Sequence, residues 1–373
     1  MISNIFDRFR PNATQGRYSP SDVIAAFQYY LGRYPEDQAA FDWHQEKTGG
    51  KLDRLREIFG NSDEFRQGIS NPTRSSIGTF FAPRTNAPKI CVLGNCQGPN
   101  IAMAISAISK QAVSVCGLEI MDVSNRLNEF ERIIADSDYV VACQVFNEKY
   151  RPLSPDALRK KFGKPVLEYS PVHFTGLHPD MLVLGNYGQR IRSPLGDYNS
   201  RIVLSAFVNG LSQAQTVEQF NRSVYARAHY FEEFEWSTKV MTEREGKFAG
   251  ENGITIADWF LPEVLRAPLL FTINHPNSRV FERFARLILD RVGVERHDVP
   301  SELIPNALAS GAIWPVDPII AEANGASYST KLTYWANNVP LPLDEFIWRS
   351  FQAYEQLGTE VLGEAMGAAV IEM

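Results

Sequence analysis

Apolar residues repeat at helical spacing over the first part of the chain, from residue 19 to about residue 70. Val23, Ile24 and Phe27 share one helical face, and glycines such as Gly32 and Gly60 break the run into short helices. A stretch without periodicity, rich in Pro, Ser, Thr, Asn and Arg, follows. The pattern therefore predicts a small all-α domain over residues 1–70 and a linker over residues 71–87.

The spacing changes after residue 88, where short apolar runs alternate with helical segments. The predicted strands are 89–93, 113–118, 139–146, 165–169 and 268–273. Strands that alternate with helices in this way form a parallel sheet, so we expect a doubly wound α/β domain over residues 88–300, with helices on both faces. Residues 301–373 are predicted to form a C-terminal helical extension packed on that domain.

The most informative polar feature is the sequence Gly-Asn-Cys-Gln-Gly at residues 94–98, where the first predicted strand runs into a helix. The N-terminus of a helix presents unpaired N–H groups and a partial positive charge, which can bind an anion and lower the pKa of a cysteine. Cys96 is therefore a candidate nucleophile. The alternative is a tight junction in which the glycines supply unusual dihedral angles and Cys96 is a small buried residue.

A second candidate, His275, follows the last predicted strand and precedes Pro276 and a helix that Asn277 or Ser278 caps. The carboxyl ends of parallel strands lie on one edge of a sheet, so Cys96 and His275 can meet there. In such a pair the imidazole takes the thiol proton or returns it to a leaving group, and the thiolate attacks an acyl carbon. On its own, His275 is better explained as a helix-capping or core histidine, and only its placement beside Cys96 favours the catalytic role.

Further residues are candidates for an oxyanion site or for substrate binding. The Cys96 and Gly117 backbone N–H groups and the side chains of Gln144 or Asn147 could stabilise a tetrahedral oxyanion. His178 could line the pocket or be a satisfied loop histidine. The complete candidate set beside Cys96 and His275 is Asn95, Gln97, Gly98, Gly117, Gln144, Asn147 and His178.

Composition excludes several other classes of protein. The 373 residues are 44% hydrophobic and 21% charged, with a net charge of -6, which fits a globular protein and gives no basic surface for nucleic acid. Four cysteines without a C-x-x-C pair indicate reduced thiols, and no motif for metal ligands is present. Without a secretory signal or a transmembrane run, we expect a cytoplasmic protein, with peripheral association at the inner membrane as an open alternative.

Four motifs together resemble the WcbI-type enzymes of capsular polysaccharide biosynthesis over residues 88 to 295. They are Gly94-Asn95-Cys96-Gln97-Gly98, Cys143-Gln144, Leu177-His178-Pro179-Asp180 and Thr272-Ile273-Asn274-His275-Pro276. That family looks like a relative of the SGNH hydrolases and is associated with coenzyme A and with acetyl transfer to capsule sugars. The resemblance implies that Cys96 stands at the position of the SGNH serine, Asn95 at that of its aspartate, and His275 at that of the catalytic histidine.

The sequence departs from the SGNH pattern at Thr272, where an aspartate three residues before the histidine is expected. A backbone carbonyl, Asp180 or Asp258 could then orient His275. Residues 19–70 resemble a small helical domain of unknown function found in bacterial surface-glycan enzymes, which suggests docking to glycan-assembly enzymes.

Three functions are compatible with these residues. The first is an acyltransferase that moves the acyl group of acyl-coenzyme A, most simply acetyl, to a sugar hydroxyl. The second is an esterase or thioesterase that uses the same Cys-His pair with water as the acceptor. The third is a non-catalytic module that binds a glycan or coenzyme A and docks a glycosyltransferase through its N-terminal domain.

Overall fold

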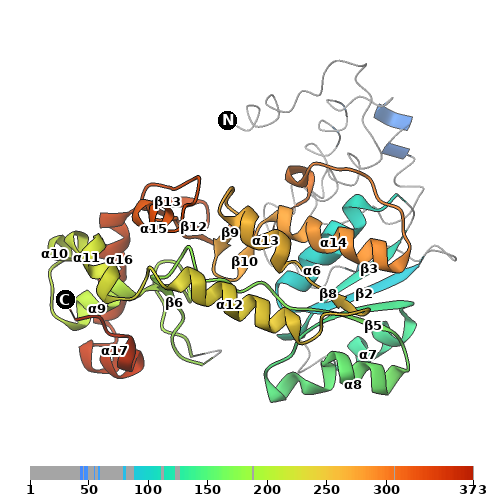
Figure 1. Cartoon of the computed structure of the whole chain (residues 1–373), viewed down its shortest axis with the longest axis horizontal. Coiled ribbons are helices and arrows are strands. Elements are labelled where there is room, and N and C mark those ends of the chain that lie inside the picture. Colours follow the sequence, from blue (N-terminus) through green and yellow to red (C-terminus); the bar gives the residue numbers. More distant parts are fainter. Residues whose placement is uncertain are drawn as a thin grey trace. The chain divides into compact units, whose positions relative to one another are not determined.

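Short buried runs rich in Val and Ile form a central sheet, as the sequence predicts (Figure 1). Its strands are β1 (Thr79–Phe80), β2 (Lys89–Gly94), β3 (Ser114–Glu119), β4 (Tyr139–Cys143), β5 (Val166–Tyr169) and β8 (Gly253–Ile254). Their order across the sheet is β1-β3-β2-β4-β5-β8. Five of these strands form a parallel sheet, and β1 adds an antiparallel edge.

Helices cover both faces of this sheet. They are α6 (Gln97–Ile108), α7 (Leu127–Asp136) and α8 (Pro155–Phe162), and the short 3-10 helix η3 (Glu148–Leu153) precedes α8. Phe130 and Leu158, from α7 and α8, are buried with Cys91 and Leu93 on one face. The opposite face carries α6, which passes so close to β3 that a Cβ added at Gly117 would lie 2.6 Å from the Pro99 Cα.

The strand order reverses beside β2, because the chain leaves β2 for β3 on one side and later enters β4 on the other. In open α/β sheets, ligands bind outside the carboxyl ends of the strands at such a reversal. The register pairs Gly94 with Glu119 and Leu93 with Ala142. The turn at residues 94–98 therefore leaves the sheet at the reversal point.

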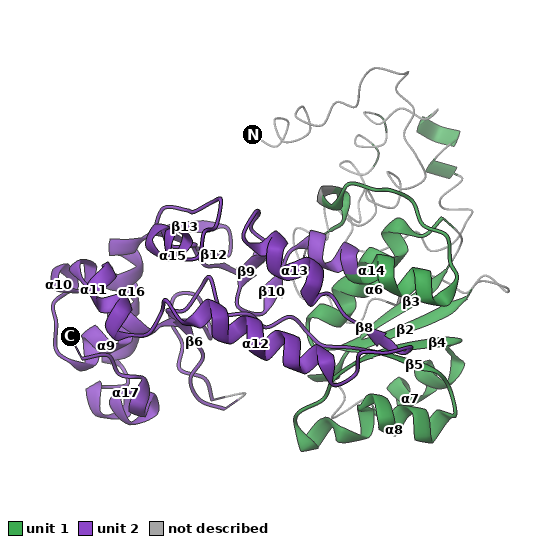
Figure 2. Ribbon diagram, in the orientation of Figure 1, with its two compact units in different colours: residues 1–167, 284–305 green, residues 168–283, 306–373 purple. Residues whose placement is uncertain are grey.

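The structure is a computed structural model, and it describes residues 43–44, 46–48, 54, 58, 79–80, 88–110, 113–121, 127–186, 189–305 and 307–372. The chain divides into two compact units, the first formed by residues 1–167 and 284–305 and the second by residues 168–283 and 306–373 (Figure 2). The predicted domain over residues 88–300 is thus shared between both units. The chain crosses from one unit to the other within β5 and within helix α14 (Ser278–Val292).

Besides β8 and the end of β5, the second unit contains helices and three small sheets. Its helices are α9 (Arg201–Val208), α10 (Gln213–Glu218), α11 (Arg222–Arg227), α12 (Glu233–Gly246), α13 (Ala257–Val264), α15 (Pro318–Ala323), α16 (Leu343–Glu355) and α17 (Thr359–Met366). The small sheets pair β6 (Met181–Leu182) with β7 (Asn199–Ser200), β9 (Leu270–Thr272) with β10 (His275–Pro276), and β11 (Ala312–Ile313) with β12 (Thr333–Ala336) and β13 (Val339–Pro342). Tyr334 stacks on Phe346 at 4.0 Å between ring centroids in their shared core.

Two expectations about the later part of the chain need correction. The run at 268–273 does form a strand, β9, but β9 pairs antiparallel with β10 across the two-residue turn Ile273-Asn274 and is not a strand of the parallel sheet. A short apolar run has the same appearance in both settings, which is why its pattern misled the prediction. In addition, the segment predicted as a helical extension contains the β11-β12-β13 sheet.

The predicted helical domain over residues 1–70 lies almost wholly outside the described residues. Trp43, His44 and residues 46–48 are helical, and the docking role suggested for this part stays a prediction. Most of the predicted linker over residues 71–87 also lies outside the described residues. Within it, β1 pairs antiparallel with β3.

Candidate functional site

The turn at residues 94–98 is held by hydrogen bonds within its own sequence. The Asn95 Oδ1 accepts the Gln97 N–H at 3.0 Å, and the Asn95 carbonyl accepts the Gly98 N–H at 2.9 Å. The Asn100 Nδ2 donates to the Cys96 carbonyl at 2.8 Å. The predicted candidates Asn95, Gln97 and Gly98 thus fix the backbone that carries Cys96.

These bonds leave little of the expected anion site at the start of α6. The N–H groups of Gln97 and Gly98 already donate to Asn95, and Pro99, next in the helix, has no N–H. The Cys96 backbone N–H is directed to its own thiol and lowers the pKa of that group. The geometry supports a seat for a neutral thiol more strongly than a site for an anion.

The electrostatics of Cys96 are opposite to the prediction. Burial and the nearby Glu119 carboxylate raise the pKa of the Cys96 thiol from 9.0 to about 12, although its backbone N–H acts in the other direction. Desolvation and a like charge both disfavour the thiolate, and they outweigh the helix N-terminus. Cys96 is therefore a protonated thiol at neutral pH. Sequence reasoning missed Glu119, which its position at the end of the strand beside β2 could have revealed.

The other candidates from the sheet have different roles. Gly117 lies within β3 beneath Pro99, where only a residue without a side chain fits. Asn147 is exposed, and its Oδ1 accepts the Lys149 N–H at 2.9 Å to cap the 3-10 helix. Gln144 follows β4, and its buried Oε1 has no hydrogen-bond partner. Among these three residues, Gln144 keeps a polar atom available for a ligand.

His275 belongs to the second unit, where the Tyr198 hydroxyl contacts its ring and is itself held by the Asn274 amide. The Tyr198 hydroxyl donates to the Asn274 Oδ1 at 2.7 Å and lies 3.2 Å from the His275 Nε2. The Thr272 hydroxyl donates to the same Asn274 oxygen at 3.1 Å. Because the Tyr198 proton is committed to Asn274, the Tyr198 oxygen accepts a hydrogen bond from the Nε2–H of neutral His275. The lone pair is then on Nδ1, which is buried without a hydrogen-bond partner.

This hydrogen-bond network shows which residue orients His275 in a chain that has Thr272 where the SGNH pattern has an aspartate. Asp180 bonds to the Ile202 N–H and the Tyr230 hydroxyl, and the charge of Asp258 acts on Glu245, so neither orients His275. Tyr198 does so, 77 residues away in sequence. Nothing in the sequence around Tyr198 distinguishes it from the other tyrosines. Burial lowers the pKa of His275 from 6.5 to about 4, so the ring is uncharged at neutral pH.

Cys96 and His275 therefore lie in different compact units. Because β9 is not part of the parallel sheet, the prediction that one edge of that sheet carries both residues is wrong. Their pairing stays a prediction. The expected cap of the following helix is confirmed, since the Asn277 Oδ1 accepts the Arg279 N–H at 3.1 Å.

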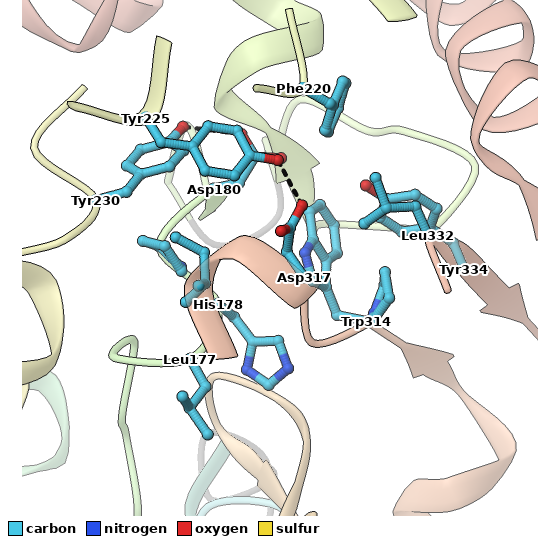
Figure 3. A pocket seen from close by; sticks show the side chains of 13 residues that line it. Leu177, His178, Asp180, Phe220, Tyr225, Tyr230, Trp314, Asp317, Leu332 and Tyr334 are labelled. Carbon is cyan, nitrogen blue, oxygen red and sulfur yellow. Dashed lines mark hydrogen bonds between the residues drawn. The ribbon is translucent and has the colours of Figure 1, made fainter. Parts of the chain in front are cut away.

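His178 lines a pocket of the second unit, together with aromatic side chains and two aspartates (Figure 3). Its side chain is buried, and neither ring nitrogen makes a well-aligned hydrogen bond. Burial lowers the pKa of His178 to about 4, and a backbone hydrogen bond with Trp314 opposes this shift. His178 lines this pocket, and its role in substrate binding stays a prediction.

The described residues contain no group of three or more His, Cys, Asp or Glu side chains placed to hold a metal ion. None of their helices combines the length and the apolar character that crossing a membrane requires.

The fold and this site define an α/β protein with a cysteine turn at the point where its parallel sheet reverses. The family model of the polysaccharide biosynthesis enzyme WcbI matches residues 89–297, and the chain belongs to that family. A solved structure described as WcbI, a novel polysaccharide biosynthesis enzyme, is 16% identical, with a TM-score of 0.60 over 76% of this chain and 95% of its own. That structure is the native protein without a disulfide bond between coenzyme A and a cysteine. No curated protein sequence matches the chain.

Proposed function

We propose that this protein is an acyltransferase that moves an acyl group, most simply acetyl, from coenzyme A to a sugar hydroxyl during the synthesis of a surface polysaccharide. Membership of a family of polysaccharide biosynthesis enzymes supports the sugar acceptor. The observation that carries the proposal is the half-buried Cys96 thiol, seated at the reversal point of the sheet, where such folds bind ligands. The description of the similar structure refers to a disulfide bond between coenzyme A and a cysteine, absent from that native form, and this association supports coenzyme A as the donor.

The turn suits the thiol end of coenzyme A better than its phosphates. Glu119 places a negative charge beside Cys96, and the Gln144 Oε1 offers an acceptor of the kind that an amide N–H of the pantetheine arm needs. Two cations of the first unit that could meet the phosphates are already paired, Arg151 with Glu148 and Lys161 with Glu131. The described turn therefore supports a site for the uncharged reactive end of the donor.

The protonation states favour a direct transfer in which Cys96 is a donor-site residue. A sugar hydroxyl attacks the thioester carbon, its proton passes to the His275 Nδ1, and the C–S bond breaks. The thiolate of coenzyme A leaves and takes that proton from His275, so that the products are the sugar ester and free coenzyme A. Neutral His275 can accept a proton at pH 7, whereas protonated Cys96 is a poor nucleophile.

The central sheet also supports the SGNH-like, doubly wound class that we infer for the first unit. Its strand order reverses beside β2 and helices cover both of its faces. Because acyl-coenzyme A is a cytoplasmic metabolite, the proposed reaction also implies a cytoplasmic location.

The test is release of coenzyme A from acetyl-coenzyme A, followed with a thiol reagent in the presence of capsule oligosaccharides or nucleotide sugars. His275→Ala should lower kcat about 100-fold or more, because it removes a general base. Cys96→Ala should mainly raise KM for acetyl-coenzyme A. In the wild-type protein, mass spectrometry during turnover should detect no acetylated Cys96 peptide. Cys116→Ala and His297→Ala are the matched controls, and both should leave turnover unchanged.

Three results would contradict parts of this proposal. Wild-type turnover that needs no sugar would identify an esterase or thioesterase. An acetylated Cys96 in the wild type, together with complete loss of activity in Cys96→Ala, would show that Cys96 is the nucleophile and not only a residue of the donor site. Full activity of folded His275→Ala would exclude His275 as the base.

A further inference from the structure

The pocket around His178 contains polar atoms that the protein does not fully satisfy. His178 is 2% exposed and Asp180 is 9% exposed. Neither His178 ring nitrogen nor the Asp180 Oδ2 makes a well-aligned hydrogen bond, although the Trp314 backbone interacts with the His178 ring and Ser200 with the Asp180 carboxyl group. A buried polar group without a partner costs about 1–3 kcal/mol. Native structures rarely leave several such atoms facing one cavity unless something else binds them. These atoms therefore need a polar partner from outside the chain, which is water or a polar group of a ligand.

Two of the donors that line the pocket are already used. The Tyr225 hydroxyl donates to Asp317 at 2.5 Å, and the Tyr230 hydroxyl donates to Asp180 at 2.9 Å (Figure 3). The wall also offers the acceptor Asp180 Oδ2, the neutral His178 imidazole, and the polar tips of Trp314 and Tyr334. A ligand group that both donates and accepts, such as a hydroxyl, meets this demand. An ammonium group only donates.

The charge of the pocket selects against anions. Among the described residues that line it, none is Lys or Arg, while Asp180 and Asp317 supply two carboxyl groups. Arg201 lies behind the Tyr230 ring, 5.9 Å from its centroid, and donates to the carbonyls of Ala228 and Ala369. A phosphate or carboxylate would thus face negative charge without a matching cation.

The size and the remaining walls narrow the ligand further. The cavity has a volume of about 20 Å³, room for one or two water molecules, so a hydroxyl or a hydroxymethyl arm fits and a whole sugar ring does not. The aromatic rings of Trp314 and Tyr334 form an apolar wall that can pack against C–H groups. Sugars combine hydroxyl groups with C–H surfaces in this way.

We propose that this pocket binds the hydroxymethyl arm of an uncharged hexose unit of the saccharide acceptor. His178 and Asp180 hydrogen-bond its hydroxyl, and Trp314 contacts its methylene group. The inference rests on the proposed saccharide acceptor and adds that the sugar bound here is neutral and keeps its primary hydroxyl.

Binding is measured by calorimetry on the full chain without an acyl donor, so its failure and the failure of acyl transfer remain distinguishable. The ligands are methyl glycosides of glucose, galactose and mannose, each with its 6-deoxy and its uronate counterpart. In at least one series the hexoside should bind about 10-fold more tightly than both counterparts, the size of one or two hydrogen bonds. Equal binding within every series, or no binding of any hexoside, would overturn the proposal.

Variants and NMR place the binding at this pocket. The hexoside should shift the ring resonance of His178, identified by its loss in His178→Gln. His178→Leu should weaken binding about 10-fold, and His178→Gln should restore part of it because the amide keeps a donor and an acceptor. Asp317→Asn removes one carboxylate of the pocket but keeps the side-chain cap of α15, so it should reduce the difference in affinity between the hexoside and its uronate. His229→Asn is the control, at an exposed histidine with φ of 60°. Undiminished affinity in folded His178→Leu would refute the assignment.

Discussion

The Cys96 turn in the first unit and the hairpin with His275 in the second both hold a titratable group in its neutral form. Burial is the main cause in each, and it raises the pKa of Cys96 to about 12 and lowers that of His275 to about 4. The neighbouring side chain differs between the two sites. A carboxylate, Glu119, reinforces the effect at Cys96, whereas uncharged Tyr198 holds His275 in place.

The comparison shows that a Cys-His pair in sequence need not be a thiolate-imidazolium pair in the protein. With these two pKa values the proton stays on Cys96 and the imidazole stays neutral. A neutral imidazole is suited to take a proton from a sugar hydroxyl, and a neutral thiol is suited to lie beside the uncharged end of a thioester. The difference between the units leads to three predictions, ordered by expected free-energy effect.

The largest effect should be acid destabilisation of the second unit. The pKa of buried His178 falls from 6.5 when unfolded to about 4 when folded, so between these values only the unfolded chain binds the proton. Stability is therefore lost as pH falls from about 6.5 to about 4, by roughly 3 kcal/mol for this residue. His275 adds to the loss, whereas Asp180, whose pKa burial raises, opposes it at the acid end.

Urea unfolding followed by tryptophan fluorescence measures this loss, because five of the six tryptophans belong to the second unit: Trp236, Trp259, Trp314, Trp335 and Trp348. His178→Gln should flatten the dependence between pH 6.5 and 4, and His229→Asn should not. An identical slope in wild type and His178→Gln would mean that His178 is not held neutral by the fold.

The second prediction concerns the reactivity of Cys96 in the first unit. A pKa near 12 instead of 9.0 makes the thiolate about 1,000-fold rarer. The greater nucleophilicity of that thiolate compensates in part, so alkylation at pH 8 should be roughly 30-fold slower than in the urea-unfolded chain, equivalent to about 2 kcal/mol. Peptide mass spectrometry after iodoacetamide treatment follows each cysteine separately.

Glu119→Gln sharpens this prediction, since it removes the charge that disfavours the thiolate. Alkylation of Cys96 should become a few-fold faster in that variant, while Glu148→Gln, at an exposed residue of the same unit, should change nothing. Rapid alkylation of Cys96 in the wild type would instead indicate an activated nucleophile and would favour the acyl-enzyme route.

The two units also differ in how far their sequences predict them. In the first unit, the alternation of apolar strand and helix patterns predicted the bounds of the elements closely, and the predicted strand at 89–93 is β2. The turn with Cys96 followed from that pattern, because its hydrogen bonds join residues no more than five positions apart. Its electrostatics did not follow, since Glu119 acts across the sheet.

The second unit depends on contacts between distant segments. The Tyr198 hydroxyl reaches His275, and Tyr225 reaches Asp317 across 92 positions. No local spacing encodes such pairs, and its short sheets give weak strand signals. Motifs in the sequence therefore marked His275 and His178 as candidates, yet the sequence could not indicate the contacts of Tyr198 and Asp317 or the pocket that His178 lines.

The smallest of the three effects should come from Tyr198→Phe, which tests how the second unit replaces the missing aspartate. The phenyl ring keeps the edge contact with His275, whose centroid lies 5.6 Å from that of Tyr198, but loses the hydroxyl that fixes the imidazole. Without it the proton can move to Nδ1, and the lone pair that we assign to the base is lost in part of the population. We expect kcat to fall about 10-fold, or about 1.4 kcal/mol, with little change in KM.

The nitrogen-15 shifts of His275 measure the tautomer directly, and they should change from those of a single Nε2–H tautomer to those of a mixture. Tyr328→Phe, which removes a hydroxyl bonded to the Val264 carbonyl in the same unit, controls for a general loss of stability. If Tyr198→Phe keeps full activity and a single tautomer, the His275 ring is held by its packing alone, and the hydroxyl network has no part in catalysis.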